Sequence, residues 1–220
     1  MRGVAAALPT GVEIEIWSDV VCPWCYIGKV RLEQAVADHP GEVTLRWRAY
    51  QLDPGAASTG GPLLAALADK FGGPQRARQI TADTAQTAAA DGLHLHFDRA
   101  VSANTFDAHR LIWYAGQHGR QAELVAALHA AHFTEGRDLG SREVLADIAA
   151  AHGLDAAGFL ASEAGSAEVA ADLHEAAELG VTSVPTFVIN GQYAVSGAQS
   201  VEAFRQVLAE VDRLSATPAA

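Results

Sequence analysis

The sequence predicts an α/β protein in which a sheet domain is interrupted by a large all-helical insertion. Strand-like segments lie toward both ends of the chain, at residues 13–17, 43–50 and 186–196. An alanine-rich stretch with helical periodicity separates them, and a Cys-Pro-Trp-Cys run directly follows the first strand. With 220 residues, 50% of them hydrophobic, the chain is long enough to bury such a core.

The first elements form a strand–helix–strand unit. Residues 13–17 alternate between polar and apolar side chains, as expected for a strand. Pro23 favours a helix start, because proline suits the first helical position, and the Pro-Gly pair after His39 is expected to end this helix. Residues 43–50 alternate again. The crossover between the two strands favours parallel pairing.

The middle of the chain is predicted to be helical. Residues 53–62 have the composition of a turn and loop, which places a domain boundary near residue 60. From there to about Gly180, glycines separate expected helices such as 104–117 and 141–152. Ser, Asn and Thr residues that can cap a helix stand at the starts of these two.

Strand character returns near the C-terminus. Residues 186–189 are β-branched and aromatic, Asn190-Gly191 is a strong hairpin signal, and residues 192–196 supply the partner strand. An amphipathic helix at 200–214 follows. The expected organisation is a discontinuous sheet domain of residues 12–60 and 181–215 that carries a helical insertion of residues 61–180.

Cys22 and Cys25 are the only cysteines, and they lie three residues apart at the expected helix start. At this spacing two helical residues are ~5–6 Å apart, which permits a reversible disulfide. A sulfur at the cap faces free backbone N–H groups and the positive end of the helix dipole, which favour thiolate over thiol. We expect Cys22 to be the attacking nucleophile and Cys25 to resolve the mixed disulfide.

A purely structural or metal-binding role suits the cysteine pair less well. A disulfide closing so small a loop would stabilise the fold little, and two inert buried thiols would explain neither the spacing nor the proline. A zinc site would need two histidines, and no candidate pair has a zinc-site signature, so we expect no metal. Scattered histidines are expected to be solvated or simply hydrogen-bonded. The candidate zinc pairs are His129 with His132 and His94 with His96.

Charge and composition limit the partners. The formal charge is −11, and Lys29 and Lys70 are the only lysines, which disfavours nucleic acid and anionic membrane surfaces. The segment from Met1 to Gly11 lacks the apolar run of a signal peptide, and we expect a cytoplasmic protein. Because thiols are kept reduced there, the pair is expected to be catalytic or redox-sensing rather than structural.

The order of elements resembles the thioredoxin fold, and the long helical insertion makes it similar to the DsbA family. Residues 17–28, 104–110 and 180–187 resemble the FrnE-type cytoplasmic branch of that family, and the match spans nearly the whole chain. The resemblance implies a thiol-disulfide oxidoreductase with Cys22 as nucleophile and Cys25 as resolving thiol.

The resemblance also implies a substrate-binding surface around the cysteines. Pro185 is expected in the cis conformation facing the disulfide, which places the backbone of Val184 where an extended substrate can pair with it. Pro23 and Trp24 are the other expected contacts. Trp24 stands where periplasmic DsbA enzymes carry histidine, so weaker thiolate stabilisation is implied. A substrate contact and packing at the cleft edge both remain open for Trp24.

Three further residues allow two interpretations each. Asp19 is either a proton acceptor near Cys25 or a turn-forming residue, and the turn is favoured. Asn104 and His109 could line the groove from the insertion, yet a helix cap and a hydrogen-bonded histidine explain them as simply.

The predicted function is thiol-disulfide exchange on polypeptides or small thiols, with no resident cofactor and with glutathione as an optional co-substrate. The sequence does not decide whether the chain forms a homodimer. Glutathione-dependent isomerases or transferases of the hydroxychromene-carboxylate isomerase and kappa type have a similar architecture. They commonly carry serine where Cys22 stands, so the two cysteines argue against them. A redox-linked holdase chaperone is the third hypothesis.

Overall fold

The computed structural model describes residues 11–57 and 60–215. The predicted absence of a signal peptide concerns Met1 to Gly11, and all but Gly11 of that segment lies outside the described residues. The elements are β1 (Val12–Ser18), α1 (Pro23–Ala37), β2 (Val43–Ala49), α2 (Leu63–Phe71), α3 (Pro74–Ala89), α4 (Phe106–Gln117), α5 (Gln121–Ala130), the π-helical turn η1 (Ala131–Glu135), α6 (Arg142–Ala151), α7 (Ala157–Leu160), α8 (Ser166–Glu178), β3 (Thr186–Ile189), β4 (Tyr193–Ser196) and α9 (Val201–Ser215).

Within the described ranges, the strands form one mixed sheet in the order β2-β1-β3-β4. β1 pairs parallel to β2, as the crossover rule predicts, and antiparallel to β3. β3 and β4 form the predicted hairpin, in which Asn190 and Gly191 have φ values of 50° and 65°. These left-handed conformations explain the Asn-Gly pair at the turn. The mixed sheet with helices α2 to α8 inserted between β2 and β3 confirms the predicted fold class.

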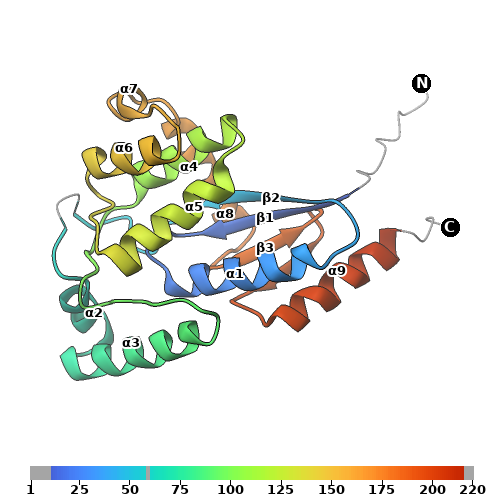
Figure 1. Ribbon diagram of the computed structural model, residues 1–220, viewed down its shortest axis with the longest axis horizontal. Helices are drawn as coiled ribbons and strands as arrows, with labels where there is room; N and C mark the ends of the chain where they lie inside the picture. Colours follow the sequence, from blue (N-terminus) through green and yellow to red (C-terminus); the bar gives the residue numbers. More distant parts are fainter. Residues whose placement is uncertain (1–10, 58–59, 216–220) are drawn as a thin grey trace.

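Helices cover both faces of the sheet (Figure 1). Helices α1 and α9 pack against each other on one face, while α8 lies against β2 on the other. Phe204 of α9 makes an edge-on contact with Phe187 of β3, with ring centroids 4.9 Å apart. On the opposite face, the indole N–H of Trp17 donates to the carbonyl of Asp172 in α8 at 3.2 Å. Alternate residues of β1 therefore face different helical layers.

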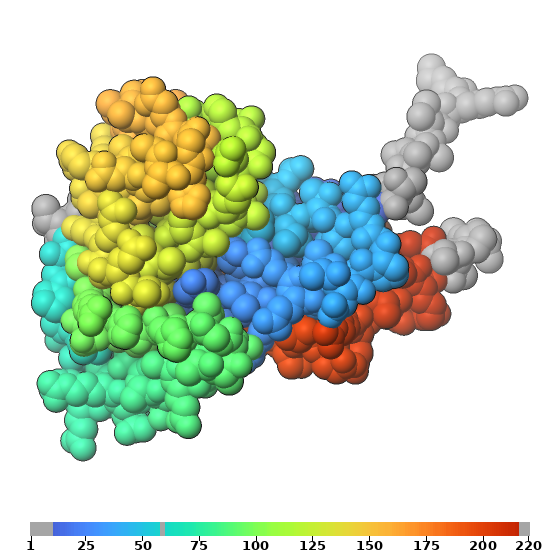
Figure 2. Space-filling view, in the orientation of Figure 1, coloured from blue at the N-terminus to red at the C-terminus, as the bar shows by residue number. Residues whose placement is uncertain are grey.

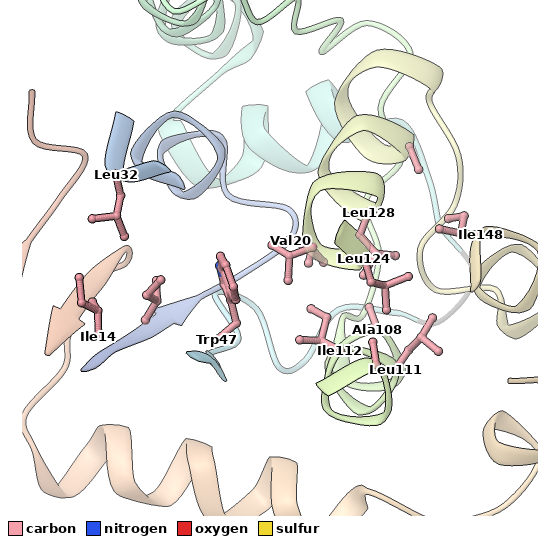
Figure 3. Close-up of a cluster of buried hydrophobic side chains, with 14 of the residues drawn as sticks. Ile14, Val20, Leu32, Trp47, Ala108, Leu111, Ile112, Leu124, Leu128 and Ile148 are labelled. Atoms are coloured by element: carbon pink, nitrogen blue, oxygen red, sulfur yellow. The ribbon is translucent and has the colours of Figure 1, made fainter. Parts of the chain in front are cut away.

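One apolar cluster connects the sheet to the inserted helices. Figure 3 shows Val20, just after β1, between Trp47 of β2 and the leucines Leu124 and Leu128 of α5. Figure 2 shows the blue N-terminal part of the chain in contact with the green and yellow inserted segments. The division into domains at residues 60 and 181 stays a prediction.

Side chains from the insertion also occupy the free edge of β2. The amide of Gln121 accepts a hydrogen bond from the Trp47 N–H at 3.0 Å and donates to the Trp47 carbonyl at 3.1 Å. The carboxylate of Asp172 accepts the Ala49 N–H at 2.9 Å. These backbone groups of an edge strand are thereby satisfied without another strand.

Some predicted boundaries differ by a few residues. The first helix was predicted to reach His39 but ends at Ala37, because the chain turns at Asp38 and the His39 N–H bonds the Val36 carbonyl at 3.0 Å. The helix expected from Asn104 begins at Phe106.

Candidate functional site

Cys22 is the N-cap of α1, with extended backbone dihedrals (φ −93°, ψ 115°), and Pro23 takes the first helical position. The Cys22 carbonyl accepts hydrogen bonds from the N–H groups of Cys25 and Tyr26 at 3.1 and 3.3 Å. The predicted helix start is therefore confirmed. The cap places the Cys22 sulfur at the positive end of the helix dipole.

The two thiols are free and both are buried, with exposed fractions of 4% for Cys22 and 2% for Cys25. Burial raises the pKa of the Cys25 thiol well above its ordinary value, and the hydrogen bond and charge of Cys22 raise it further. The Ser18 hydroxyl and the Asp19 backbone N–H oppose this rise. Cys25 therefore holds its proton at neutral pH and must lose it before it can attack a disulfide.

The segment before β3 lies against the motif. The Cys22 thiol donates to the carbonyl of Val184 at 3.7 Å. The Val184–Pro185 peptide bond is cis, and Pro185 is buried. Cys22, Val184 and Pro185, which come from opposite ends of the chain, thus lie together at the start of α1.

Gly28 is a site residue that the sequence analysis did not single out. A Cβ atom at this position would lie 3.0 Å from Cγ of Pro185 and 3.3 Å from Cζ of Phe187. Any larger residue would require Pro185 and Phe187 to shift by a few tenths of an ångström, so glycine suits this close approach of α1. A glycine inside a helical pattern is a known signal of close packing and could have identified it.

Trp24 is the exposed member of the motif. Its exposed fraction is 42%, while Pro23 is partly buried and Thr182 and Ser183 across the site are exposed. The indole therefore presents apolar surface to solvent beside the buried thiols. Its predicted role as a substrate contact stays a prediction.

Asp19 makes the turn that the sequence favours. Its backbone carbonyl accepts the Cys22 N–H at 3.0 Å, and its buried carboxylate accepts the Leu52 N–H at 2.8 Å. The second contact ties the turn after β1 to the segment after β2. His109 of α4 lies beside the other carboxylate oxygen, with its Nε2 atom at 3.4 Å.

Asn104 has a structural part in holding the loop after β2. Its side-chain oxygen accepts from the Phe106 N–H at 3.0 Å and from the Gln51 amide at 3.2 Å. Its amide nitrogen donates to the carbonyls of Pro54 and Ala56 at 3.1 and 3.2 Å. These bonds tie the insertion to the loop after β2.

Two histidines are wholly buried; His129 is hydrogen-bonded through Nδ1 to the Val125 carbonyl, as expected for one of the two alternatives, whereas neither ring nitrogen of His132 has a hydrogen-bond partner among the described residues. His129 and His132 both have exposed fractions of 0%. Burial lowers the pKa of His129 to about 3 and that of His132 to about 4, so both are neutral at pH 7. Among residues 11–57 and 60–215, no cluster of three or more His, Cys, Asp or Glu side chains could hold a metal ion.

The strand order, the helical insertion and two cysteines in the first turn of α1 together define a thioredoxin-type oxidoreductase fold. The chain belongs to the family described as DSBA-like thioredoxin domain, whose model matches residues 13–209. The predicted membership of the DsbA family is thus confirmed. The FrnE-type branch stays a prediction.

Solved structures share this fold. A probable DsbA oxidoreductase, SCO1869 from Streptomyces coelicolor, is 38% identical with a TM-score of 0.87, over 95% of this chain and 93% of its own. A 2-hydroxychromene-2-carboxylate isomerase is 20% identical with a TM-score of 0.69, over 94% and 100% of the two chains. The cytosolic disulfide reductase DsbM from Pseudomonas aeruginosa with GSH is 22% identical with a TM-score of 0.62, over 91% and 99%. The similarity of this chain to the isomerase and to DsbM concerns the fold alone.

Proposed function

We propose that this protein is a thiol-disulfide oxidoreductase that cycles Cys22 and Cys25 between dithiol and disulfide. The observation that carries the proposal is the pair of free thiols in the first turn of α1, with the Cys22 sulfur against the Val184 carbonyl. The unequal environments of the thiols suit unequal roles. Cys22 sits at the positive helix end, whereas burial keeps Cys25 protonated.

The proposed cycle has two exchange steps. The Cys22 thiolate attacks a substrate disulfide, forms a mixed disulfide with one half and releases the other half as a thiolate. Cys25 then loses its proton, and its thiolate attacks the Cys22 sulfur. The Cys22–Cys25 disulfide forms, the second half leaves as a thiolate, and the substrate has gained two electrons. A small thiol such as glutathione would restore the dithiol through the reverse exchanges.

The substrate would bind over Trp24, Pro23 and the segment of Val184 and Pro185. The exposed indole offers apolar contact, and the backbone beside the cysteines suits an extended polypeptide segment. Low-molecular-weight disulfides would bind at the same site.

The described part of the chain contains no helix long and apolar enough to cross a membrane.

We place this cycle in the cytoplasm, where thiols are kept reduced and glutathione is present. The similar DsbM structure is described as cytosolic and was solved with GSH, which supports glutathione as a co-substrate. Substrates are thiol- or disulfide-containing polypeptides or small thiols.

The direct test is reduction of insulin in the presence of dithiothreitol, comparing the parent with Cys22→Ser. We expect the variant to fall to the uncatalysed rate, and equal activity would remove Cys22 from the mechanism. Two results would favour other functions. A glutathione-dependent spectral change on a chromene substrate that survives Cys25→Ser would indicate an isomerase, and suppressed client aggregation by the double cysteine variant would indicate a holdase.

A further inference from the structure

Asp19 and His109 form a buried pair between the sheet and the insertion. The carboxylate Oδ1 of Asp19 lies 3.4 Å from Nε2 of His109. Their exposed fractions are 1% and 3%. Within the described residues, neither of these two atoms has a hydrogen-bond partner. Buried polar atoms without a partner are uncommon and often mark a function.

Asp19 also borders the two thiols. Its backbone N–H lowers the pKa of the Cys25 thiol, and its carbonyl accepts the Cys22 N–H at 3.0 Å. Asp19 is buried, whereas the ring of Trp24 in the same motif region is exposed. A proton leaving Cys25 in this direction would meet Asp19.

His109 connects this pair to a cavity. A cavity of about 680 Å³ lies along β2 and the facing surfaces of α4, α5 and α8, and His109 is one of its lining residues. Arg48 and Asp172 line the same cavity and form an ion pair at 2.9 Å. His109 thus borders both Asp19 and a cavity whose lining includes charged side chains.

We propose that His109 is a positioning residue that carries the Cys25 proton from Asp19 to the cavity along β2. The inference rests on the proposed function. In the resolving step, the Cys25 thiol gives its proton to the Asp19 carboxylate, which passes it to Nε2 of His109. The imidazole releases a proton from its other nitrogen to solvent in the cavity. The Cys25 thiolate forms a bond to the Cys22 sulfur, and the departing substrate thiolate takes a proton from solvent.

The charged groups around this path suit the transfer. Asp19 faces His109 from the turn after β1, while Asp172 of α8 and Arg48 of β2 border the cavity. Burial raises the pKa of Asp172, and its bond to the Ala49 N–H and the charge of Arg48 oppose the rise. The buried His129 and His132 are neutral at pH 7 and do not compete for the proton.

Reaction of the reduced protein with the aromatic disulfide DTNB separates the two steps. Attack by Cys22 releases the first thionitrobenzoate, and attack by Cys25 on the mixed disulfide releases the second. Stopped-flow absorbance then measures two rates. The first phase tests the proposed function, and the second phase tests the proton path.

Two variants distinguish proton transfer from a structural role. We expect His109→Gln and His109→Ala to keep the first phase and to slow the second by ~10-fold or more, since proton transfer by a positioned group typically contributes at least this much. Glutamine retains an N–H that can face Asp19 but cannot carry a proton at neutral pH. In His109→Ala, added imidazole should enter the enlarged cavity and restore the second phase in proportion to its concentration.

The control is His118→Gln, at the C-cap of the same helix α4 and exposed, which should leave both phases unchanged. A second phase at the parent rate in either His109 variant would overturn the proton path while leaving the proposed function intact. If the parent protein shows no first phase, both proposals fail.

If the His109 variants do not fold, the pH dependence of the second phase in the parent protein tests the proton path independently. We measure its second phase from about pH 5 to about pH 8. The proposed path predicts a rate that rises by less than tenfold per pH unit, because Asp19 and His109, rather than bulk hydroxide, take up the proton. A rate that rises tenfold per pH unit throughout would mean that bulk hydroxide removes the proton, and would overturn the path.

Discussion

The ring of Tyr26 stacks on the imidazole of His129, with ring centroids 4.9 Å apart and the planes at 12°. This contact joins the helix of the cysteine motif to α5 of the insertion. The Nδ1 atom of His129 lies 2.9 Å from the Val125 carbonyl, while its Nε2 atom has no hydrogen-bond partner among the described residues. A charge on this imidazole would be costly because the ring is wholly buried.

We predict that His129 makes the protein less stable in mild acid. Burial lowers the pKa of His129 from 6.5 to about 3, with the nearby positive charge of Lys29 adding to the effect. As the pH falls below the unfolded value, the unfolded chain binds a proton that the folded chain excludes. The free energy of unfolding then falls by up to ~1.4 kcal/mol per pH unit until the folded pKa is reached.

His129→Phe keeps a ring against Tyr26 and removes the titrating group. Urea unfolding between pH 6.5 and about 4 should show a smaller loss of stability for this variant than for the parent. The exposed His174→Gln serves as the control and should follow the parent. Parallel curves for parent and His129→Phe would contradict the prediction.

We predict that Gly28→Ala disturbs the site through Pro185. The added methyl group would need Pro185 and Phe187 to move by a few tenths of an ångström. Such overpacking costs about 1–3 kcal/mol of folding free energy, and it should slow insulin reduction by shifting the segment that faces Cys22. Gly158→Ala in α7 is the matched control, since its Cβ would meet nothing within 4 Å. If the two variants have the same melting temperature and the same insulin-reduction activity, the close contact between Gly28 and Pro185 affects neither stability nor activity, and the prediction is wrong.

We predict that Trp24→Ala weakens reduction of polypeptides selectively. The indole is 42% exposed, so its removal should change stability by less than about 0.5 kcal/mol. For insulin, kcat/KM should fall by about tenfold, which corresponds to ~1.4 kcal/mol of lost binding, while the first DTNB phase stays near the parent rate. Tyr193→Ala, an exposed aromatic of β4, is the control. An equal fall for insulin and DTNB would assign Trp24 to the thiol chemistry instead.

We predict that Cys25→Ser traps a mixed disulfide. Without the resolving thiol, the adduct formed by attack of Cys22 on glutathione disulfide should accumulate, and intact-protein mass spectrometry would show one added glutathione. Cys22→Ser should form little adduct, because burial raises the pKa of the remaining Cys25 thiol. Faster modification of Cys22→Ser than of Cys25→Ser would reverse the assigned roles.

Local patterns predicted the parts of the fold that depend on neighbouring residues. Pro23 after Cys22 predicted the helix start, and the Asn190-Gly191 pair predicted the hairpin, because both rest on the dihedral preferences of a few residues. Alternation in two strands with a helix between them predicted their parallel pairing. The cysteine spacing predicted the centre of the candidate site for the same reason.

Contacts between distant segments were not predictable in this way. Asp19 and His109 are separated in the chain by α1, β2, α2 and α3, and no local pattern indicates that their side chains meet. The burial of His129 and His132 depends on how α5 and η1 pack against α1. The approach of Gly28 to Pro185 joins opposite ends of the chain. Each of these arises from tertiary packing rather than from propensity.

The amide of Gln121, bound to both backbone groups of Trp47, has a consequence for self-association. Exposed strand edges recruit other extended chains and lead to aggregation. Gln121 and Asp172 occupy the half of β2 that ends at Ala49, so a client polypeptide or a second copy cannot extend the sheet there. The half of β2 that Gln121 and Asp172 cover is thereby kept from pairing with other extended chains.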